Sequence, residues 1–287
     1  MASYPPPKSS RLAVADLPAS SPRPWASSSA TRGSSRIGWL LSLPFLVFLV
    51  LPLIAIILRT PPEQLWANLG QAQVYQAISI SLKTSTVATL VTIVFGTPLA
   101  YAMARREFRF KRVIDTLIDL PTVLPPAVAG VALLMAFGRR GLLGSLLDDW
   151  GIHIAFTQTA VVIAQTFIAA PLYLKSAIVG FASVEPELEQ AAALDGASNW
   201  NVFRHVTVPL SGAALLSGSV LTWARALGEF GATIIFAGNF PGRTQTMPLA
   251  IYIGFELDLD IALTLSVILI GLSFLILILI KGVLRHE

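Results

Sequence analysis

Six apolar runs, each long enough to cross a lipid bilayer, constrain this chain more than any other feature. They cover residues 37–58, 76–104, 117–137, 156–181, 212–237 and 261–280. A bilayer interior leaves backbone groups without water, so only helices and closed barrels span it, and a helix needs about 20 apolar residues. Of all residues, 54% are hydrophobic and 13% are charged. The runs therefore predict an all-α integral membrane protein with six transmembrane helices.

The first 36 residues differ from the rest of the chain, because they are rich in Pro, Ser and Ala and lack an apolar pattern. We expect residues 1–36 to form a disordered cytoplasmic tail and residues 37–285 to form one membrane domain. The run at 37–58 is longer than the core of a signal peptide, and no small-residue cleavage site clearly follows it. We therefore expect it to remain as a membrane helix.

Basic residues predict the orientation in the membrane. Five of them lie between Arg105 and Arg112, and thirteen lie in the tail, this run, the loop at 183–210 and the C-terminus together. Only Arg59, Arg139, Arg140 and Arg243 lie in the segments on the other side. Lys and Arg accumulate in cytoplasmic loops, so both termini and the loop at 183–210 are expected in the cytoplasm. Nucleic-acid binding is the weaker interpretation, because no basic domain with interleaved aromatic residues accompanies the run.

The segment Ser183–Leu210, called here the two-helix loop, interrupts the apolar pattern with two short helices around a glycine. Ser183 is suited to cap the first helix, Pro186 falls in its first turn, and Gly196 ends it. Ser198 is suited to cap the second helix, which we expect Pro209 to end. Trp200 and Phe203 are three residues apart and share one face of that helix.

The two-helix loop resembles the EAA loop of ABC importer permeases. That pattern is Glu-Ala-Ala, three residues, Gly, nine residues, Ile, one residue and Leu-Pro. Here the places are taken by Gln190-Ala191-Ala192, Gly196, Val206 and Val208-Pro209. The spacing is intact, but Gln190 replaces the glutamate and valines replace the Ile and Leu. These departures put in doubt only a specific salt bridge to the partner. The alternative is a helical cytoplasmic loop of any polytopic protein.

This resemblance implies the fold of a type I ABC importer permease whose cytoplasmic loop contacts a separate ATPase subunit. Trp200 and Phe203 would fill a groove on the ATPase, and Gly196 would permit the bend. The residues expected to couple the two subunits are Glu189, Gln190, Ala191, Ala192, Gly196, Trp200, Phe203 and Pro209.

Charged and hydroxylated residues inside the apolar runs are the candidates for a translocation path, because intramembrane charge usually faces a cavity or a partner. They are Lys83, Thr84, Arg225, Glu229 and Thr233. The hydroxyl-rich part of run 76–104 can line a path for anions, or its hydroxyls can bond to their own helix while Lys83 extends outward. Arg225 and Glu229 are four residues apart, and they can line the path or form a structural ion pair.

A second resemblance narrows the family. Ala224 to Thr233 and Ala237 to Thr246 are similar to segments of the permease subunit of molybdate ABC importers, and Ser81-Leu82-Lys83 supports the match. It implies a homodimer in the bacterial plasma (inner) membrane, a cytoplasmic ATPase dimer that binds the ATP and Mg, and an external oxyanion-binding protein. Sulfate and tungstate importers remain the alternatives.

No sequence feature predicts that this chain catalyses a reaction. It has no cysteine and no Gly-Lys dipeptide, so it lacks thiolate sites and the phosphate-binding loop of ATPases. We expect no catalytic residue, metal or cofactor on this chain. An integral membrane enzyme is the remote alternative, with Ser217 and Ser219 as the nearest candidates, although no general base lies within their reach. A scaffold protein would have no use for Arg225 and Glu229 inside a span.

Overall fold

The computed structural model describes residues 32–284, and every regular element in this range is a helix. The expected tail lies mostly outside it, and residues 32–36 already belong to α1 (Arg32–Arg59), so the expected boundary at residue 36 falls inside a helix. Residues up to Val50 form a unit of their own, and α1 is therefore described by itself. Its apolar window Leu41–Arg59 buries no side chain, as expected for a helix surrounded by acyl chains.

Three long helices form the centre of the unit that starts at Leu51. They are α3 (Ala72–Arg105), α7 (Gln158–Ser183) and α11 (Gly212–Leu227), and each packs against the other two. Glycines allow α7 and α11 to approach closely: a Cβ at Gly218 would lie 2.6 Å from that of Ser176, and one at Gly180 would lie 2.6 Å from that of Ala214. In lipid, such close packing holds helices together, since acyl chains are as apolar as the side chains.

The third expected span, 117–137, is a bent pair of helices in the structure. α4 (Lys111–Val123) and α5 (Pro126–Phe137) meet at 116°. Leu124 between them is extended, because a residue before proline avoids the helical region, and Pro125 has no N–H to donate. The break thus follows from the proline pair, whereas Pro121 lies within α4. Pro126 also lies at a helix contact, since a Cβ at Gly231 would lie 2.6 Å from the Cβ of Pro126.

The fifth expected span, 212–237, is divided between α11 and the short helix α12 (Gly231–Phe236), which packs against α5. The sixth corresponds to α14 (Leu259–Leu284), which packs against α11, α2 (Pro62–Leu69) and α13 (Met247–Leu257). Within residues 32–284, four helices are long and apolar enough to cross a membrane, and six spans result if each of two bent pairs counts as one. The prediction of a helical protein with six spans agrees with this architecture.

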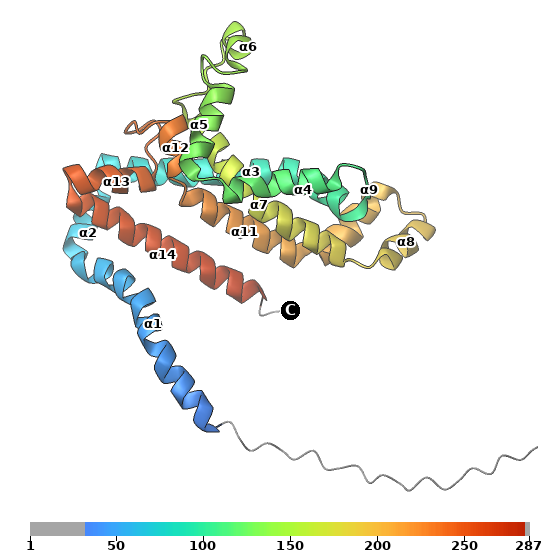
Figure 1. Cartoon of the computed structure of the whole chain (residues 1–287), viewed down its shortest axis with the longest axis horizontal. Coiled ribbons are helices and arrows are strands. Elements are labelled where there is room, and N and C mark those ends of the chain that lie inside the picture. The colour runs from blue at the N-terminus through green and yellow to red at the C-terminus, as the bar shows by residue number, and fades with distance from the viewer. Residues whose placement is uncertain (1–31, 285–287) are drawn as a thin grey trace, which may run out of the picture. The chain divides into compact units, whose positions relative to one another are not determined.

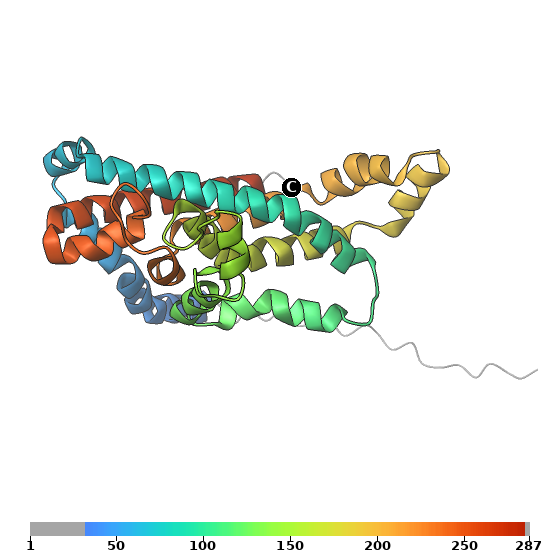
Figure 2. The same ribbon diagram turned by 90° about the horizontal axis from the view of Figure 1, so that it is seen from above.

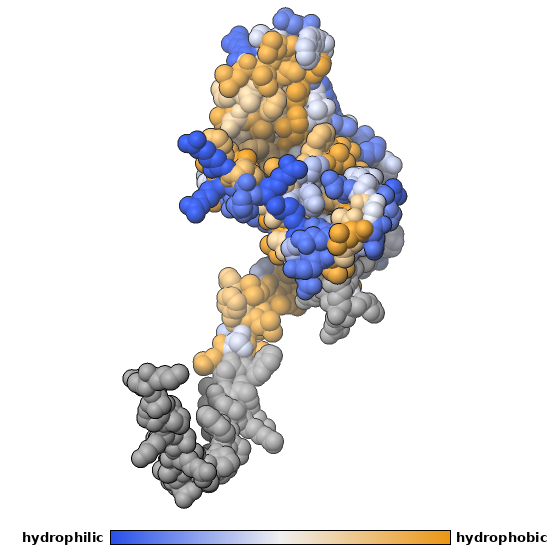
Figure 3. Space-filling view, turned by 90° about the vertical axis from the view of Figure 1, so that its right-hand side faces the viewer, coloured by the Kyte–Doolittle hydropathy of each residue, from blue (hydrophilic) through white to orange (hydrophobic). Residues whose placement is uncertain are grey.

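The long helices place the connecting segments at two ends. The loop helices α8 (Pro186–Leu194) and α9 (Asn199–Val202) lie at one end of α3, α7 and α11, and α2 and α13 lie at the other (Figures 1 and 2). Figure 3 looks onto the end with α8 and α9, where hydrophilic side chains gather. The alternation of apolar runs in the sequence predicts this separation.

Candidate functional site

The first helix of the two-helix loop, α8, begins at Pro186 as predicted, but its N-cap is Glu185. Ser183 does not cap it, because α7 extends as far as Ser183, whose hydroxyl donates to the Gly180 carbonyl over 2.8 Å. None of the α8 residues is buried, and Leu194 is 89% exposed. Most of the surface of α8 is therefore open, except around Glu189 and Ala192, which are partly buried.

Gly196 and Ser198 connect the two helices as predicted. Gly196 has a φ of +89°, which L-residues rarely adopt, and a Cβ there would meet no atom within 4 Å. The Ser198 hydroxyl accepts a hydrogen bond from the Asn201 N–H over 3.3 Å and so caps α9. The bend depends on backbone conformation and not on contacts around Gly196.

The second helix of the loop is longer than predicted. α9 continues into a π-helical turn, η1 (Phe203–Thr207), and then into α10 (Val208–Leu210). Pro209 therefore does not end the helix. The π-helical turn, in which the Val208 N–H donates to the Phe203 carbonyl, lies directly before this proline, which has no N–H of its own. The chain then bends by 72° into α11, with only Ser211 between the two helices.

Glu189 ties the loop to the ends of α3 and α7. Its Oε1 accepts hydrogen bonds from Arg105 Nη2 over 2.9 Å and from Thr207 Oγ1 over 2.6 Å. The same Arg105 Nη2 donates to the Val184 carbonyl over 2.9 Å. Both charged side chains are mostly buried, at 16% and 17% exposure, so removal of either one would leave the other as a mostly buried, unpaired charge. Sequence reasoning took Arg105 only as a sign of orientation, and only the fold brings it to Glu189.

An aromatic cluster lies under the second loop helix. Phe203 contacts Tyr101 and Phe181 with ring centroids 5.1 and 6.1 Å apart, so it packs within this chain. Trp200 stacks on Phe203 at 5.7 Å and remains 64% exposed. A cavity of about 470 Å³ adjoins Trp200; its lining comprises Pro98, Tyr101, Ala102, Arg106, Asn199, Trp200 and Phe203. Of the two aromatic residues that we predicted to contact a partner, Trp200 is the more exposed.

Hydroxyl groups along α3 bond to their own helix. Thr84 Oγ1 donates to the Ile80 carbonyl over 2.8 Å, and Thr89 and Thr92 repeat the pattern with the residues four positions earlier. Thr84 and Thr233 are buried, whereas Lys83 is exposed. Gln165 is also fully buried, with an amide that has no partner in the part of the chain that the structure describes. Among the predicted path residues on α3, Lys83 alone offers an open surface.

Arg225 and Glu229 form an ion pair at the end of α11, with 2.7 Å between Arg225 Nη1 and Glu229 Oε2. Glu229 is 1% exposed, and its Oε1 accepts a hydrogen bond from the Ala232 N–H over 2.9 Å. It thus satisfies a free N–H at the start of α12. Arg225 remains 37% exposed, so the two residues differ in position: Glu229 fixes the break between α11 and α12, and Arg225 reaches the surface.

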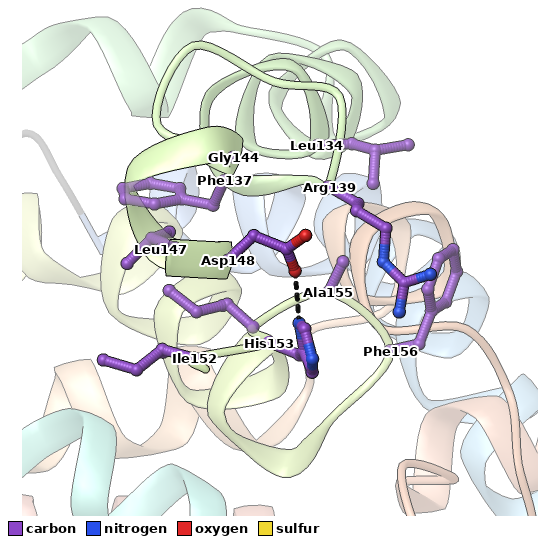
Figure 4. A pocket seen from close by; sticks show the side chains of 11 residues that line it. Leu134, Phe137, Arg139, Gly144, Leu147, Asp148, Ile152, His153, Ala155 and Phe156 are labelled. Atoms are coloured by element: carbon purple, nitrogen blue, oxygen red, sulfur yellow. Dashed lines mark ion pairs between the residues drawn. The ribbon is translucent and has the colours of Figure 1, made fainter. Parts of the chain in front are cut away.

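A cavity of about 370 Å³ lies where α6 (Gly144–Asp149) follows α5 (Figure 4). Its walls are mostly apolar, and an Asp148–His153 pair at 3.1 Å and Arg139 supply the charge. No group of three or more metal-ligating side chains occurs among residues 32–284.

The architecture and the two-helix loop define a class: a polytopic helical membrane protein with an exposed two-helix loop at one end. A family model described as "Binding-protein-dependent transport system inner membrane component" matches residues 96–284. The match covers more than half of the chain and includes α7, the whole loop, α11 and α14. The chain therefore belongs to this family of membrane permeases.

Individual relatives refine the comparison. The "Molybdenum transport system permease protein ModB" of Mycobacterium bovis is 44% identical over 209 residues, which cover 72% of this chain and 79% of the relative. The "Probable sulfate transport system permease protein cysT" of Chlorokybus atmophyticus is 35% identical over 218 residues, covering 75% and 76%. A bacterial ABC transporter involved in alginate import superposes with a TM-score of 0.69 at 14% identity, over 88% of this chain and 96% of that one. This last likeness concerns the fold alone.

Proposed function

We propose that this chain is the membrane-spanning subunit of an ATP-driven importer of molybdate. One observation carries the proposal: α8 and α9 form an exposed two-helix loop that is anchored to α3 and leads through a 72° bend into α11. A partner that moves the loop would move the spans with it. This chain offers no phosphate-binding loop, so ATP and Mg belong to a separate ATPase subunit.

Molybdate is favoured over sulfate by the relatives. The permease named for molybdenum transport is 44% identical, against 35% for the one named for sulfate. The segment Ala237 to Thr246 supports the same choice, because its Pro-Gly-Arg-Thr-Gln-Thr part resembles molybdate permeases. Tungstate has the same charge and geometry as molybdate and is the alternative substrate.

The orientation follows from charge. The basic run from Arg105 to Arg112 lies at the same end of the helices as α8 and α9 (Figure 1). Basic residues gather on the cytoplasmic side of a membrane protein, so the loop faces a cytoplasmic ATPase. The opposite end, with α2 and α13, then faces an external binding protein. Both chain termini are cytoplasmic in this arrangement, and the membrane is the bacterial inner membrane.

A second copy of this chain completes the path in our proposal. α5 and α6 stand off the bundle of α3, α7 and α11 (Figure 1), and Figure 3 shows a largely hydrophobic surface over them. Val131, Met135 and Leu146 are exposed there, and Leu142 is 86% exposed. In our proposal part of this apolar surface contacts the second copy and the remainder faces lipid.

Substrate identity is tested by reconstitution in liposomes with the ATPase and the binding protein. Molybdate is expected to raise ATP turnover at lower concentrations than sulfate does, with tungstate as the comparison. Turnover that responds to sulfate and not to molybdate would assign the chain to sulfate import.

Arg225→Gln tests the path. We expect it to slow molybdate uptake at least about tenfold, an effect of the size of a lost charged contact. The melting temperature falls by less than this loss of uptake would suggest, because buried Glu229 loses its ion-pair partner but keeps its hydrogen bond from the Ala232 N–H. Glu229→Gln is the contrast, and it should lower stability more, because Glu229 is buried and holds the start of α12. If Arg225→Gln reduces uptake and stability equally, the pair is structural.

A further inference from the structure

Helix α4 has two different faces. Asp115 and Asp119 bind Lys175 of α7 at 2.6 and 2.9 Å, and Ile118 is buried in the cluster around Tyr173. The other face carries a stripe at helical spacing that is 45–80% exposed: Phe110, Val113, Leu117, Leu120 and Val123. One face of α4 is therefore fixed to the bundle, and an apolar stripe is left open.

A cavity of about 520 Å³ lies at the start of α4. Its lining comes from the end of α3, the turn at 106–110, the first turns of α4 and one residue of α7. The lining residues are Met103, Glu107, Phe108, Arg109, Lys111, Arg112, Asp115 and Ile178. Met103, Phe108 and Ile178 give it apolar walls. Charged side chains supply the remainder of the lining.

The charges in this cavity do not balance. Its two carboxylates are already paired, Glu107 with Lys111 at 2.6 Å and Asp115 with Lys175 at 2.6 Å. Arg109 and Arg112 form no ion pair with any residue of the described range 32–284, and both are exposed. Two guanidinium groups beside an apolar stripe suit a planar or tetrahedral anion that carries a hydrocarbon chain.

We propose that this site binds an anionic phospholipid, with the phosphate on Arg109 and Arg112 and an acyl chain along the exposed stripe of α4. The 13 residues of α4 span about 20 Å, which is comparable with the roughly 15 Å depth of one leaflet's hydrocarbon. A free anion would leave the stripe uncovered. The placement in the cytoplasmic leaflet rests on the proposed orientation, but the binding itself does not.

Native mass spectrometry of the full-length permease tests this with phosphatidylglycerol and phosphatidylcholine of identical acyl chains. The unmodified protein is expected to prefer phosphatidylglycerol. Arg109→Gln combined with Arg112→Gln should weaken phosphatidylglycerol binding about tenfold and leave phosphatidylcholine binding unchanged. Arg109→Lys with Arg112→Lys keeps the charge and most of the preference. Arg139→Gln with Arg140→Gln removes an equally exposed arginine pair elsewhere and should change nothing.

Three results would overturn the proposal. In the first, the Arg109→Gln, Arg112→Gln variant keeps the full preference for phosphatidylglycerol. In the second, inorganic phosphate at equal concentration displaces the lipid from the unmodified protein, which indicates a free-anion site. In the third, the same variant loses ATPase binding while its lipid preference is intact, which indicates a protein interface. If the double glutamine variant does not fold, the double lysine variant provides the test. Loss of the preference for phosphatidylglycerol in the lysine variant, which keeps both positive charges, would contradict the proposed lipid site. Lipid preference is measured without transport, so a negative result for the lipid site can be distinguished from a negative result for the proposed transport function.

Discussion

Gly196→Asp is expected to produce a folded, membrane-inserted permease that no longer stimulates its ATPase. Aspartate at a φ of +89° costs about 1 kcal/mol and shifts the angle between α8 and α9. No atom lies within 4 Å of the position of the new Cβ, so the strain stays in the two-helix loop and the bundle is unaffected. We expect ATPase stimulation to fall at least about tenfold, the usual size of a coupling free energy between sites.

Gly151→Asp is the matched control. Gly151 has a φ of +69° and is equally free of neighbours, but it lies after α6, away from the loop. The same charge is introduced, again at a positive φ, and coupling should remain normal. ATP turnover of both reconstituted variants, measured beside their melting temperatures, makes the comparison. Normal stimulation with Gly196→Asp would remove the loop from the coupling mechanism.

Glu189→Gln is expected to have the second large effect. The amide keeps the shape of the side chain but leaves Arg105 charged and mostly buried without its carboxylate. We expect a loss of roughly 2 kcal/mol in the free energy of unfolding and a loss of coupling, because α8 is then no longer tied to the ends of α3 and α7. Thermal unfolding and ATP turnover of the reconstituted complex measure the two effects.

Glu187→Gln is the control for this prediction. Glu187 lies in the first turn of the same helix, but it is exposed and forms no ion pair within the described residues. Removing its charge changes the helix-dipole interaction by only a few tenths of a kcal/mol. Equal effects of the two substitutions would mean that the charge of α8, and not the link between Glu189 and Arg105, matters for coupling.

Sequence reasoning predicted those features that depend on local physics. The apolar runs predicted the helical membrane architecture, and Gly196 and Ser198 predicted the turn between α8 and α9. Each of these depends on a few consecutive residues whose backbone preferences are strong.

Features that depend on contacts distant in sequence were not predictable in this way. Arg105 and Glu189 are separated by 84 positions, and only the packing of α3 against α7, with the C-terminal ends of both helices at the same end of the bundle, brings them together. The failure of Ser183 to cap α8 has a similar cause, since the length of α7 decides which helix uses it. The helix also passes Pro209 because a π-helical turn precedes it, and the sequence carries no signal for that turn.

A single cysteine at position 200 provides the most direct test of the central claim, which is that the two-helix loop faces a cytoplasmic ATPase. The chain has no cysteine of its own, and Trp200 is 64% exposed, so Trp200→Cys gives one accessible thiol. A membrane-impermeant maleimide should label it in inverted membrane vesicles but not in intact spheroplasts, and bound ATPase should protect it. Labelling in intact spheroplasts would contradict the account.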